Sequence, residues 1–387
     1  MKKKLSLFLL VLVLVTASLT GCGKPQETGS GSSDDVIKIG VFEPMTGAQA
    51  AGGEMTVEGI KLANEAKGEV LGKKVELVVV DNKSDKVEAA NAVSRLIDKD
   101  KVVAIIGSYS SSLSMSAGDI VKKAKVPAVG CSPTNPLVTL NNDYYFRVCF
   151  IDPFQGTVMA NYAVNDLGAK TAAIIQDVNQ DYSVGLSKYF IDSFKELTGD
   201  ENSIVEMTSY NTGDQDFTAQ LTNVKAKNPD VIFAPGNYGE CALLIKQARD
   251  LGIEVPVLGG DTWEAPEFLQ IGGNAVEGAV FSTHFTAEAP VTEKSTVFLD
   301  EYEAKFEKEA NAFAALGYDA YMVILDAIER GNSTDPQVIR DKLAETKDFV
   351  GATGNITIDE NGDAVKSAVI KKVDGGKFVY LTTVEPK

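Results

Sequence analysis

The sequence contains a single histidine, and this scarcity excludes most of the common catalytic arrangements. A Ser-His-Asp or Cys-His arrangement would have to use His284. That residue stands just after a predicted strand, and the chain has no G-x-S-x-G nucleophile motif. The phosphate loop G-x-x-x-x-G-K-[ST] and a strand-bound G-x-G-x-x-G are missing as well. We therefore expect a protein that is not an enzyme and that carries no cofactor.

Cysteine is almost as rare, with four in the chain. Cys131, Cys149 and Cys241 are widely spaced, without a C-x-x-C pair, and the lone histidine gives them no partner with zinc-ligand spacing. We expect no metal site. These three residues are either buried free thiols or include one disulfide, and the sequence leaves both possibilities open.

Basic residues are outnumbered, since 37 Lys and Arg face 54 Asp and Glu for a formal charge of −17. Nucleic acids and anionic lipid surfaces both reward clustered Lys and Arg, so neither is an expected partner. The acidity is typical of a soluble, non-adhesive surface.

Long apolar runs are also lacking, except for residues 7–15 near the start of the chain. That run follows Lys2, Lys3 and Lys4 and is too short to cross a bilayer, so it predicts a signal peptide over residues 1–21. The following Leu19-Thr20-Gly21-Cys22 resembles a bacterial lipobox, which implies cleavage before Cys22 and acylation of its thiol. An ordinary secretory signal with a chance cysteine is the alternative.

The segment after Cys22 is polar and rich in Gly and Ser (GKPQETGSGSSDD), and it predicts a flexible tether over residues 22–35. About 350 residues then remain, enough for two domains of ordinary size.

From residue 36 the chain alternates strand-like and helix-like segments, which predicts parallel sheets with helices on both faces. The β-branched, apolar runs predict strands near 36–42, 74–81, 102–107, 126–129, 171–176, 204–209, 231–234, 255–258 and 279–282. Helical spacing is found near 88–99, after 113, and near 154–167, 185–198, 217–227, 240–251, 293–310, 314–329 and 336–345. The end of the chain is strand-rich, with turn signals at Asn361-Gly362 and Gly375-Gly376.

Polar groups gather where predicted strands end, and this is where α/β proteins bind ligands. Gly107-Ser108-Tyr109-Ser110-Ser111-Ser112 follows one strand and opens a helix, so its amides and hydroxyls suit an anion such as a carboxylate. A plain N-cap serine is the alternative. The next strand ends in Cys131-Ser132-Pro133-Thr134-Asn135-Pro136, a proline-stiffened loop that exposes two hydroxyls or merely connects two lobes.

The segments VIKIGVFEPMTG, IGSYSSSLS, VPAVGCSPTNPLVT and YYFRVCFIDPFQG occur in this order. Together with DVNQDYSVGL, DVIFAPGNYGECALLIKQARDLG and VLGGDTWEAPEF, they resemble the branched-chain-amino-acid type of periplasmic binding protein. The resemblance extends over nearly the whole chain after the tether.

The resemblance implies the type I periplasmic binding protein fold, in which two doubly wound parallel-sheet lobes are joined by a three-strand hinge. Residues 36–151 and 284–365 would form the first lobe, and residues 152–283 and 366–387 the second. The ligand would be held in the cleft between them.

The resemblance also implies binding residues. Ser111, Ser132 and Thr134 of the first lobe would hold a carboxylate, while Tyr182 closes over the ligand and Asp261 pairs with its ammonium group. Tyr238 matches a pocket position, and its neighbour Asn237 is the other candidate there.

Each of these assignments has a structural alternative. Tyr182 could be a surface residue, and Asp261 could cap the helix that begins near Ala265. Trp263 either lines the cleft or packs in the lobe interface. Ala50-Ala51-Gly52-Gly53 replaces a tyrosine common in the family's first glycine-rich turn. Leucine, isoleucine or valine is therefore not assured as the ligand.

By resemblance, the chain is expected to be the monomeric solute-binding protein of an ABC importer. It would capture an amino acid, branched-chain or otherwise aliphatic, and deliver it to a permease with cytoplasmic ATPases. Cys22 would anchor it at the outer face of the cytoplasmic membrane, on the periplasmic side in a Gram-negative cell. The alternatives are a ligand-sensing ectodomain for another amino acid, amide or small carboxylate, and a secreted hydrolase.

Overall fold

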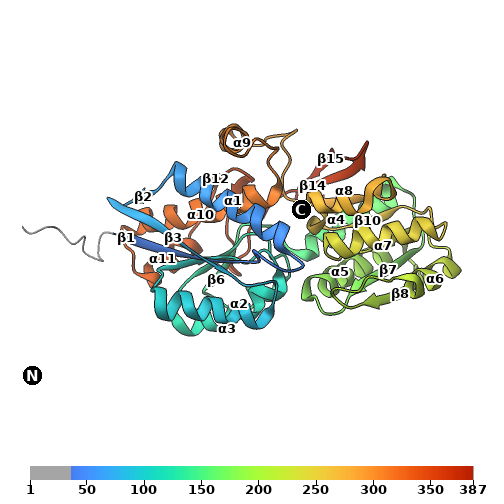
Figure 1. The fold of residues 1–387 in the computed structure, drawn as a ribbon, viewed down its shortest axis with the longest axis horizontal. Helices are drawn as coiled ribbons and strands as arrows, with labels where there is room; N and C mark the ends of the chain where they lie inside the picture. Colours follow the sequence, from blue (N-terminus) through green and yellow to red (C-terminus); the bar gives the residue numbers. More distant parts are fainter. Residues whose placement is uncertain (1–35, 387) are drawn as a thin grey trace, which may run out of the picture. The chain divides into compact units, whose positions relative to one another are not determined.

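The computed structural model describes residues 36–386. The predicted signal peptide, Cys22 and the tether lie outside this part of the chain. Within it, the main strands form two separate sheets in which parallel pairs predominate, so the predicted α/β class with two sheets is confirmed (Figure 1). We call the part built on the first sheet the first lobe and the part built on the second sheet the second lobe.

The first sheet has six strands in the order β2-β3-β1-β4-β5-β6. All neighbouring pairs are parallel except β2 with β3. The strands are β1 (Val36–Glu43), β2 (Glu69–Val70), β3 (Lys73–Asp81), β4 (Ala104–Ile106), β5 (Ala128–Gly130) and β6 (Tyr145–Arg147).

Alternating residues of these strands face two different helical layers. Ile39 and Val41 of β1 pack in a core with α1 (Ala50–Ala66) and α10 (Ala312–Gly331). Phe42, on the other face, packs with α2 (Lys86–Arg95) and α3 (Ser111–Ala124). The two helical layers lie on opposite sides of the sheet in Figure 1. Burial on both faces explains why the strands read as nearly continuous apolar runs.

The second sheet has seven strands in the order β15-β14-β11-β10-β9-β7-β8. Those from β7 to β11 run parallel, and β14 and β15 add an antiparallel edge. The strands are β7 (Ala172–Asp177), β8 (Ile204–Tyr210), β9 (Val231–Phe233), β10 (Val257–Gly259), β11 (Val280–Thr283), β14 (Ala368–Asp374) and β15 (Lys377–Val384).

Helices cover both faces of this sheet as well. One core includes residues of α4 (Asp152–Asn161) and α5 (Asp181–Thr198). The other contains residues of α6 (Thr218–Lys227), α7 (Tyr238–Asp250) and α8 (Pro266–Gly272). The remaining elements include α9 (Glu293–Phe306), α11 (Pro336–Ala344), the hairpin β12 (Phe349–Gly351) and β13 (Gly354–Ile356), and short helical turns η2 (Leu96–Asp100), η3 (Pro136–Val138), η4 (Tyr162–Asp166), η5 (Asp261–Trp263) and η6 (Gly273–Val276).

The chain passes between the two sheets three times. It leaves the first sheet after β6, returns after β11 to add α9, α10 and α11, and enters the second sheet again at β14. Phe298, Leu316 and Ile356 of the returning segment pack in the same core as the β1 side chains. The three connections match the predicted hinge. No helix in residues 36–386 is long and apolar enough to span a membrane.

The segment Ala50-Ala51-Gly52-Gly53, expected as a loop, is instead the first turn of α1. Its glycines serve close packing. A Cβ on Gly53 would lie 2.0 Å from the Pro44 carbonyl oxygen, and one on Gly52 would lie 2.4 Å from the ring of Tyr109. Because glycine alone fits there, the residues that suggested a turn mark a helix pressed against its neighbours.

Candidate functional site

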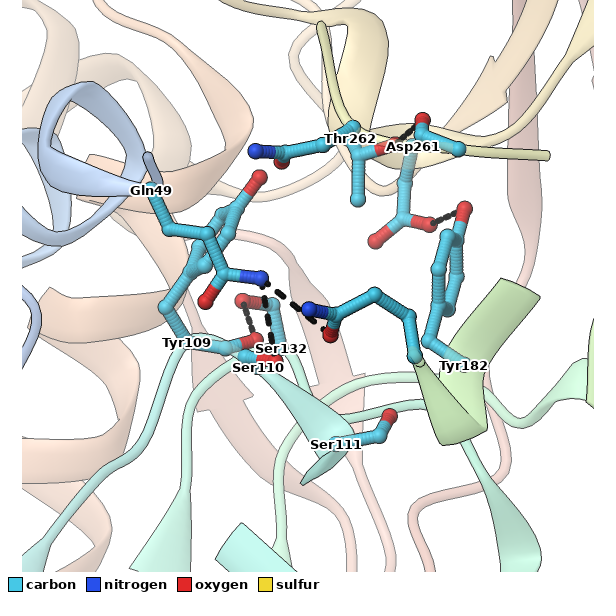
Figure 2. A pocket seen from close by; sticks show the side chains of 11 residues that line it. Gln49, Tyr109, Ser110, Ser111, Ser132, Tyr182, Asp261 and Thr262 are labelled. Atoms are coloured by element: carbon cyan, nitrogen blue, oxygen red, sulfur yellow. Dashed lines mark hydrogen bonds between the residues drawn. The ribbon is translucent and has the colours of Figure 1, made fainter. Parts of the chain in front are cut away.

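A small cavity lies between the two lobes at the carboxyl ends of parallel strands (Figure 2). Its volume is about 20 Å³, room for little more than one water molecule. A larger ligand therefore enters only when the two walls separate. The lining residues are Gln49, Tyr109, Ser110, Ser111 and Ser132 of the first lobe and Gln180, Tyr182, Gly236, Asn237, Asp261 and Thr262 of the second.

Asp261 is the one charged side chain among these lining residues, and it is 1% exposed. Its Oδ1 accepts hydrogen bonds from Tyr182 Oη at 2.8 Å and Gln155 Nε2 at 2.9 Å. Its Oδ2 lies 3.1 Å from His284 Nε2. These three partners therefore orient the Asp261 carboxylate within the wall of the cavity.

Tyr182 stands in the first turn of α5 and is buried, so it is not a surface tyrosine. Burial is the main cause that raises its pKa well above 10, and the charge of Asp261 acts in the same direction. The side chain is therefore a neutral phenol at physiological pH and donates to Asp261. Asp261 itself makes no side-chain cap for α8, whose N-cap residue is Ala265.

The opposite wall carries hydroxyl groups and the start of α3. Ser111 Oγ accepts from the Asn135 amide at 3.1 Å, and Ser132 Oγ donates to the Tyr109 carbonyl at 3.1 Å. Ser110 is the N-cap residue of α3 but makes no side-chain cap bond; its Oγ accepts from Gln49 Nε2 at 3.3 Å instead. The simple N-cap alternative therefore does not describe this serine cluster.

Thr134 was predicted to share this wall, but it does not line the cavity. It is fully buried beside Asp152, the first residue of α4. Burial raises the pKa of Asp152 to about 8, against the smaller, opposite effect of the Thr134 hydroxyl. The proline-stiffened loop that carries Thr134 directs it inward, so this hydroxyl reaches a ligand only if the loop changes.

The two neighbouring candidates, Asn237 and Tyr238, occupy different positions. Asn237 lines the cavity and donates from Nδ2 to the Ala48 carbonyl of the first lobe at 2.9 Å. Tyr238 does not line it; its hydroxyl accepts from the Ala51 amide at 3.2 Å. Of the two, the asparagine is the residue that faces the cavity, and the tyrosine joins the lobes beside it.

Trp263 lies in neither of the two expected positions. It is fully buried in the second-lobe core, where its ring stacks on Phe268 with a centroid distance of 4.8 Å. A Cβ on Gly259 would lie 2.2 Å from the indole. The ring thus fills the space under the turn that carries Asp261, and packing rather than ligand contact accounts for it.

Several site residues escaped the sequence analysis, above all Gln49, Tyr109, Gln155 and His284. Gln49 and Tyr109 follow strands β1 and β4, so their place after a strand was a usable signal. Gln155 and His284 come from α4 and the segment after β11, and meet Asp261 only through the fold. His284 also stacks on Phe150 with a centroid distance of 3.8 Å.

A buried carboxyl supports the turn before α3. Glu43 is fully buried, and its Oε2 accepts from the Tyr109 amide at 2.6 Å and from Ser108 Oγ at 3.2 Å. Burial raises its pKa to about 8, although these hydrogen bonds act in the opposite direction. Glu43 thus fixes the backbone that presents Tyr109 and Ser110 to the cavity.

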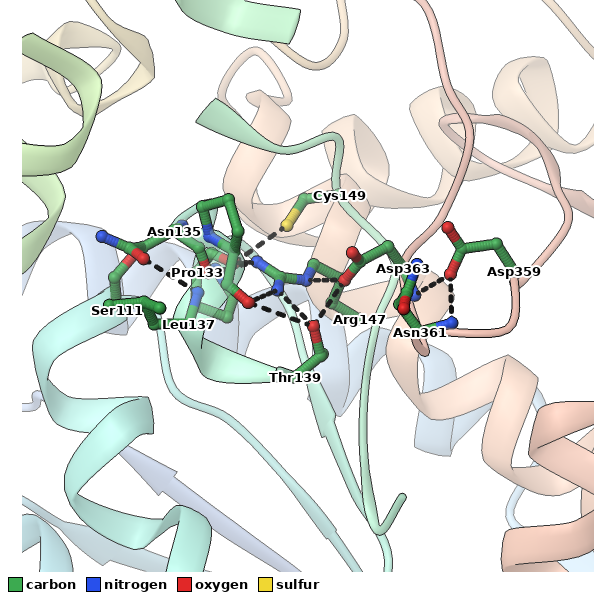
Figure 3. A network of polar contacts seen from close by, with 11 residues as sticks. Ser111, Pro133, Asn135, Leu137, Thr139, Arg147, Cys149, Asp359, Asn361 and Asp363 are labelled. Atoms are coloured by element: carbon green, nitrogen blue, oxygen red, sulfur yellow. Dashed lines mark hydrogen bonds and ion pairs between the residues drawn. The ribbon is translucent and has the colours of Figure 1, made fainter. Parts of the chain in front are cut away.

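A buried arginine supports the loop between β5 and β6 (Figure 3). Arg147 Nη1 donates to the carbonyl oxygens of Pro133 at 2.6 Å and Asn135 at 2.9 Å. Its Nε forms an ion pair with Asp363 at 2.6 Å, and Nη2 donates to Thr139 Oγ1 at 2.7 Å. The guanidinium, with its planar fork of donors, fixes the loop that carries Ser132.

Direct polar contacts also join the lobes at the start of α5, beside the cavity. The Asp181 carboxylate accepts from Lys86 Nζ and from Ser112 Oγ, both at 2.9 Å. The Asp181 carbonyl accepts from Asn135 Nδ2 at 2.8 Å. Because Lys86, Ser112 and Asn135 belong to the first lobe, these contacts exist only when the walls are together.

The three cysteines in the described part of the chain, Cys131, Cys149 and Cys241, are free and buried. Burial raises the pKa of each thiol. Of the two possibilities that the sequence left open, the structure has the unpaired thiols.

Comparison with known proteins gives consistent matches along nearly the whole described chain. Residues 36–377 match the family described as periplasmic binding protein. The chain is 31% identical over 355 residues to the Leu/Ile/Val-binding protein homolog 3 of Brucella melitensis, covering 89% of this chain and 93% of that protein.

Two solved structures extend the similarity to three dimensions. A leucine-binding protein LivK from Thermotoga maritima is 48% identical with a TM-score of 0.88, covering 90% of this chain and 99% of that one. The branched-chain amino acid transporter substrate-binding protein LivJ from Streptococcus pneumoniae, solved with isoleucine, is 35% identical with a TM-score of 0.85, covering 91% of this chain and all of that one.

Proposed function

Because this chain belongs to the periplasmic binding protein family, we propose that it is the solute-binding protein of an ABC importer and captures an α-amino acid between its lobes. The names of its relatives make a branched-chain or other aliphatic amino acid the first expectation. It works by binding and release, without catalysis.

The observation that carries the amino-acid assignment is the pairing of opposite chemistries across one cavity. Asp261 is the single charge in the lining, while Ser111 and Ser132 lie with the start of α3 on the other wall. A carboxylate offers about four lone-pair positions, and Tyr182, Gln155 and His284 use three of them. One position remains for an ammonium group, and hydroxyls and helix-start amides suit the α-carboxylate.

Capture proceeds by hinged closure. A ligand favours the closed form only through contacts that the open form lacks. A shift from mostly open to mostly closed needs about 5 kcal/mol of differential affinity. One charge-assisted bond to Asp261 supplies about 1.5–3 kcal/mol. The remainder comes from the other ligand contacts that form only on closure, such as contacts with Tyr182 of the second lobe. The cross-lobe contacts of Asp181 and Asn237 stabilise the closed form itself and so reduce the shift that the ligand has to supply.

The test uses one amino acid in three forms. A thermal-shift screen identifies the amino acid that binds, because a ligand that binds only the folded state raises Tm. Calorimetry then compares it with its N-acetyl derivative, which lacks the ammonium, and its amide, which lacks the carboxylate. We expect each derivative to bind at least tenfold more weakly. An N-acetyl derivative that binds as tightly as the free amino acid would refute the role of Asp261.

A variant pair checks the same residue from the protein side. Asp261→Ala should weaken binding at least tenfold while the circular dichroism spectrum stays unchanged. Asp192→Asn, on the exposed face of α5 and paired only with Lys188, is the matched control and should bind as the wild type does. Equal affinities of Asp261→Ala and the control would remove Asp261 from the site.

The proposal extends to the rest of the chain. Residues 36–151 with 284–365 form the first lobe, and residues 152–283 with 366–387 form the second. Cys22 carries the lipid that holds the protein at the outer face of the cytoplasmic membrane, beside a permease with cytoplasmic ATPases. The protein acts as a monomer. In a cell fractionation, Cys22→Ala should move it from the membrane to the soluble fraction, and unchanged partitioning would exclude a lipid anchor.

A further inference from the structure

The cavity has a second end, formed by Gln49, Tyr109 and Asn237, which we call the amide end. Figure 2 shows Gln49 and Tyr109 on the side of the cavity opposite Asp261 and Tyr182. Asn237 belongs with them, because its Nδ2 donates to the carbonyl of Ala48, the neighbour of Gln49. These three residues are 6%, 3% and 5% exposed, respectively.

Each of the three has a buried polar atom that lacks a hydrogen-bond partner within residues 36–386. These atoms are Gln49 Oε1, Tyr109 Oη and Asn237 Oδ1. Buried polar groups in folded proteins are nearly always paired, so three such atoms around one cavity call for an explanation. A ligand that hydrogen-bonds to them is the simplest one.

The orientation of the Asn237 amide follows from its partner. Its anchoring bond runs to a backbone carbonyl, which can only accept, so the atom at that position must be the NH₂ group. The atom left for the cavity is therefore the carbonyl oxygen, an acceptor.

The orientation of Gln49 follows from a longer chain of bonds. The Asp177 carboxylate accepts from Thr212 Oγ1, so that hydroxyl is left to accept from Gln180 Nε2 at 3.3 Å. Gln180 Oε1 is then the acceptor that faces Gln49 Nε2 at 3.5 Å. Gln49 therefore also leaves a carbonyl oxygen to the cavity.

The third atom, Tyr109 Oη, can either donate or accept a hydrogen bond. Burial raises the pKa of Tyr109 well above 10, so the group is a phenol. Its ring is fixed edge-on against Phe313 at a centroid distance of 4.9 Å and lies against Gly52. The amide end thus offers two fixed acceptors and one phenol hydroxyl, so a ligand group that donates hydrogen bonds fits it best.

No charged residue stands at this end among the residues that line the cavity, since Asp261 lies across from it. A cationic side chain would lose its hydration there without gaining a counter-charge, and an anionic one would meet two carbonyl oxygens. A neutral donor remains.

We propose that the amide end selects an amino acid whose neutral side chain donates hydrogen bonds, a carboxamide or a hydroxyl, in place of the aliphatic side chain that the names of the relatives suggest. This rests on the proposed function, in which Asp261 and the serine wall hold the ammonium and carboxylate groups. An aliphatic side chain at the amide end leaves the three polar atoms buried and unpaired. A site built to bond a donor discriminates strongly against a ligand that lacks it.

Two ligand pairs of matched shape test the proposal on the wild-type protein. Asparagine and leucine differ by a carboxamide for an isopropyl group, and threonine and valine by a hydroxyl for a methyl group. By calorimetry we expect asparagine to bind at least tenfold more tightly than leucine, and threonine at least tenfold more tightly than valine. Leucine and valine binding as tightly as their polar partners, or more tightly, would overturn the proposal and leave the proposed function intact. A protein that binds no amino acid at all would overturn both.

A variant pair locates the effect. Gln49→Met keeps the length of the side chain but replaces the amide oxygen by a thioether, which accepts hydrogen bonds only weakly, so the preference for asparagine over leucine should fall at least fivefold. Gln215→Met replaces an exposed glutamine of the second lobe outside the cavity and should leave the preference unchanged. An unchanged preference in Gln49→Met would remove Gln49 from the recognition of the side chain and contradict the proposal.

Discussion

The cross-lobe contacts of Asp181 allow closure to be weakened without touching the cavity. The Asp181 side chain is 39% exposed and does not line the cavity, yet its carboxylate joins Lys86 and Ser112 of the first lobe. In Asp181→Asn the backbone bonds to Ser112 and Asn135 remain possible, and the charge is lost. The substitution therefore removes the contribution that the Asp181 charge makes to the stability of the closed form.

The expected size follows from the exposure of the pair. Lys86 is 50% exposed, so its ion pair contributes at most about 1 kcal/mol. The bond from Ser112 to a charged acceptor is worth more in a buried setting, but partial exposure reduces it to about 1 kcal/mol. A total of about 1–2 kcal/mol corresponds to a roughly 5- to 30-fold weaker apparent affinity, because ligand binding and closure are linked.

Calorimetry of the wild type, Asp181→Asn and Lys86→Met provides the assay, with small-angle scattering to follow closure. Lys86→Met should lose about fivefold at most, and raising the salt concentration should narrow the gap between wild type and variants. Asp192→Asn serves as the control, since its ion pair with Lys188 lies within one helix. If Asp181→Asn bound and closed as the wild type does, the contacts at the start of α5 would play no part in closure.

Three further predictions concern the groups that support the cavity. The Glu43 carboxyl should be protonated in the folded state and ionised in the unfolded one between pH 4.5 and about 8. As the pH rises through this window, the free energy of unfolding of the wild type should therefore fall relative to that of Glu43→Gln by up to about 1.4 kcal/mol per pH unit. A difference between the two free energies that stays constant across the window in chemical denaturation would refute the assignment. Since a carboxylate only accepts hydrogen bonds, His284 must carry a proton on Nε2. Because the chain has one histidine, its imidazole gives a single set of signals in a ¹⁵N spectrum. Signals of the Nδ1–H tautomer alone would contradict the prediction. Arg147→Met should lower the free energy of unfolding by about 3–5 kcal/mol in chemical denaturation, because it leaves Asp363 without its buried partner, and a loss below 1 kcal/mol would contradict that.

Much of the fold was predictable because central strands such as β1 and β7 are buried on both faces and most helices bury one face. The apolar run over β1 and the stripe along α5 are local patterns, and both predict their elements directly. Helix α1 was not among the predicted helices, and its first turn was expected as a loop, since Gly52 and Gly53 indicate a loop unless the close approach of Tyr109 and Pro44 is known. That approach is a property of the assembled lobe.

The site residues also fall into two groups, those that local patterns indicate and those that only the assembled fold brings together. The turn that carries Ser111 was predictable from its place after a strand, whereas Tyr182 and Asp261 were assigned by the resemblance to the family. Thr134 follows a strand too, but its loop turns it toward Asp152. His284 and Gln155 meet Asp261 only across long sequence separations, so no local pattern indicates them.

The most direct test of the account is a crystal structure of the protein with its tightest-binding amino acid. The ammonium nitrogen should lie within hydrogen-bond distance of the Asp261 carboxylate, with the α-carboxylate toward Ser111 and Ser132. An amino acid bound elsewhere, or bound in this cavity with its ammonium group directed away from Asp261, would contradict the account.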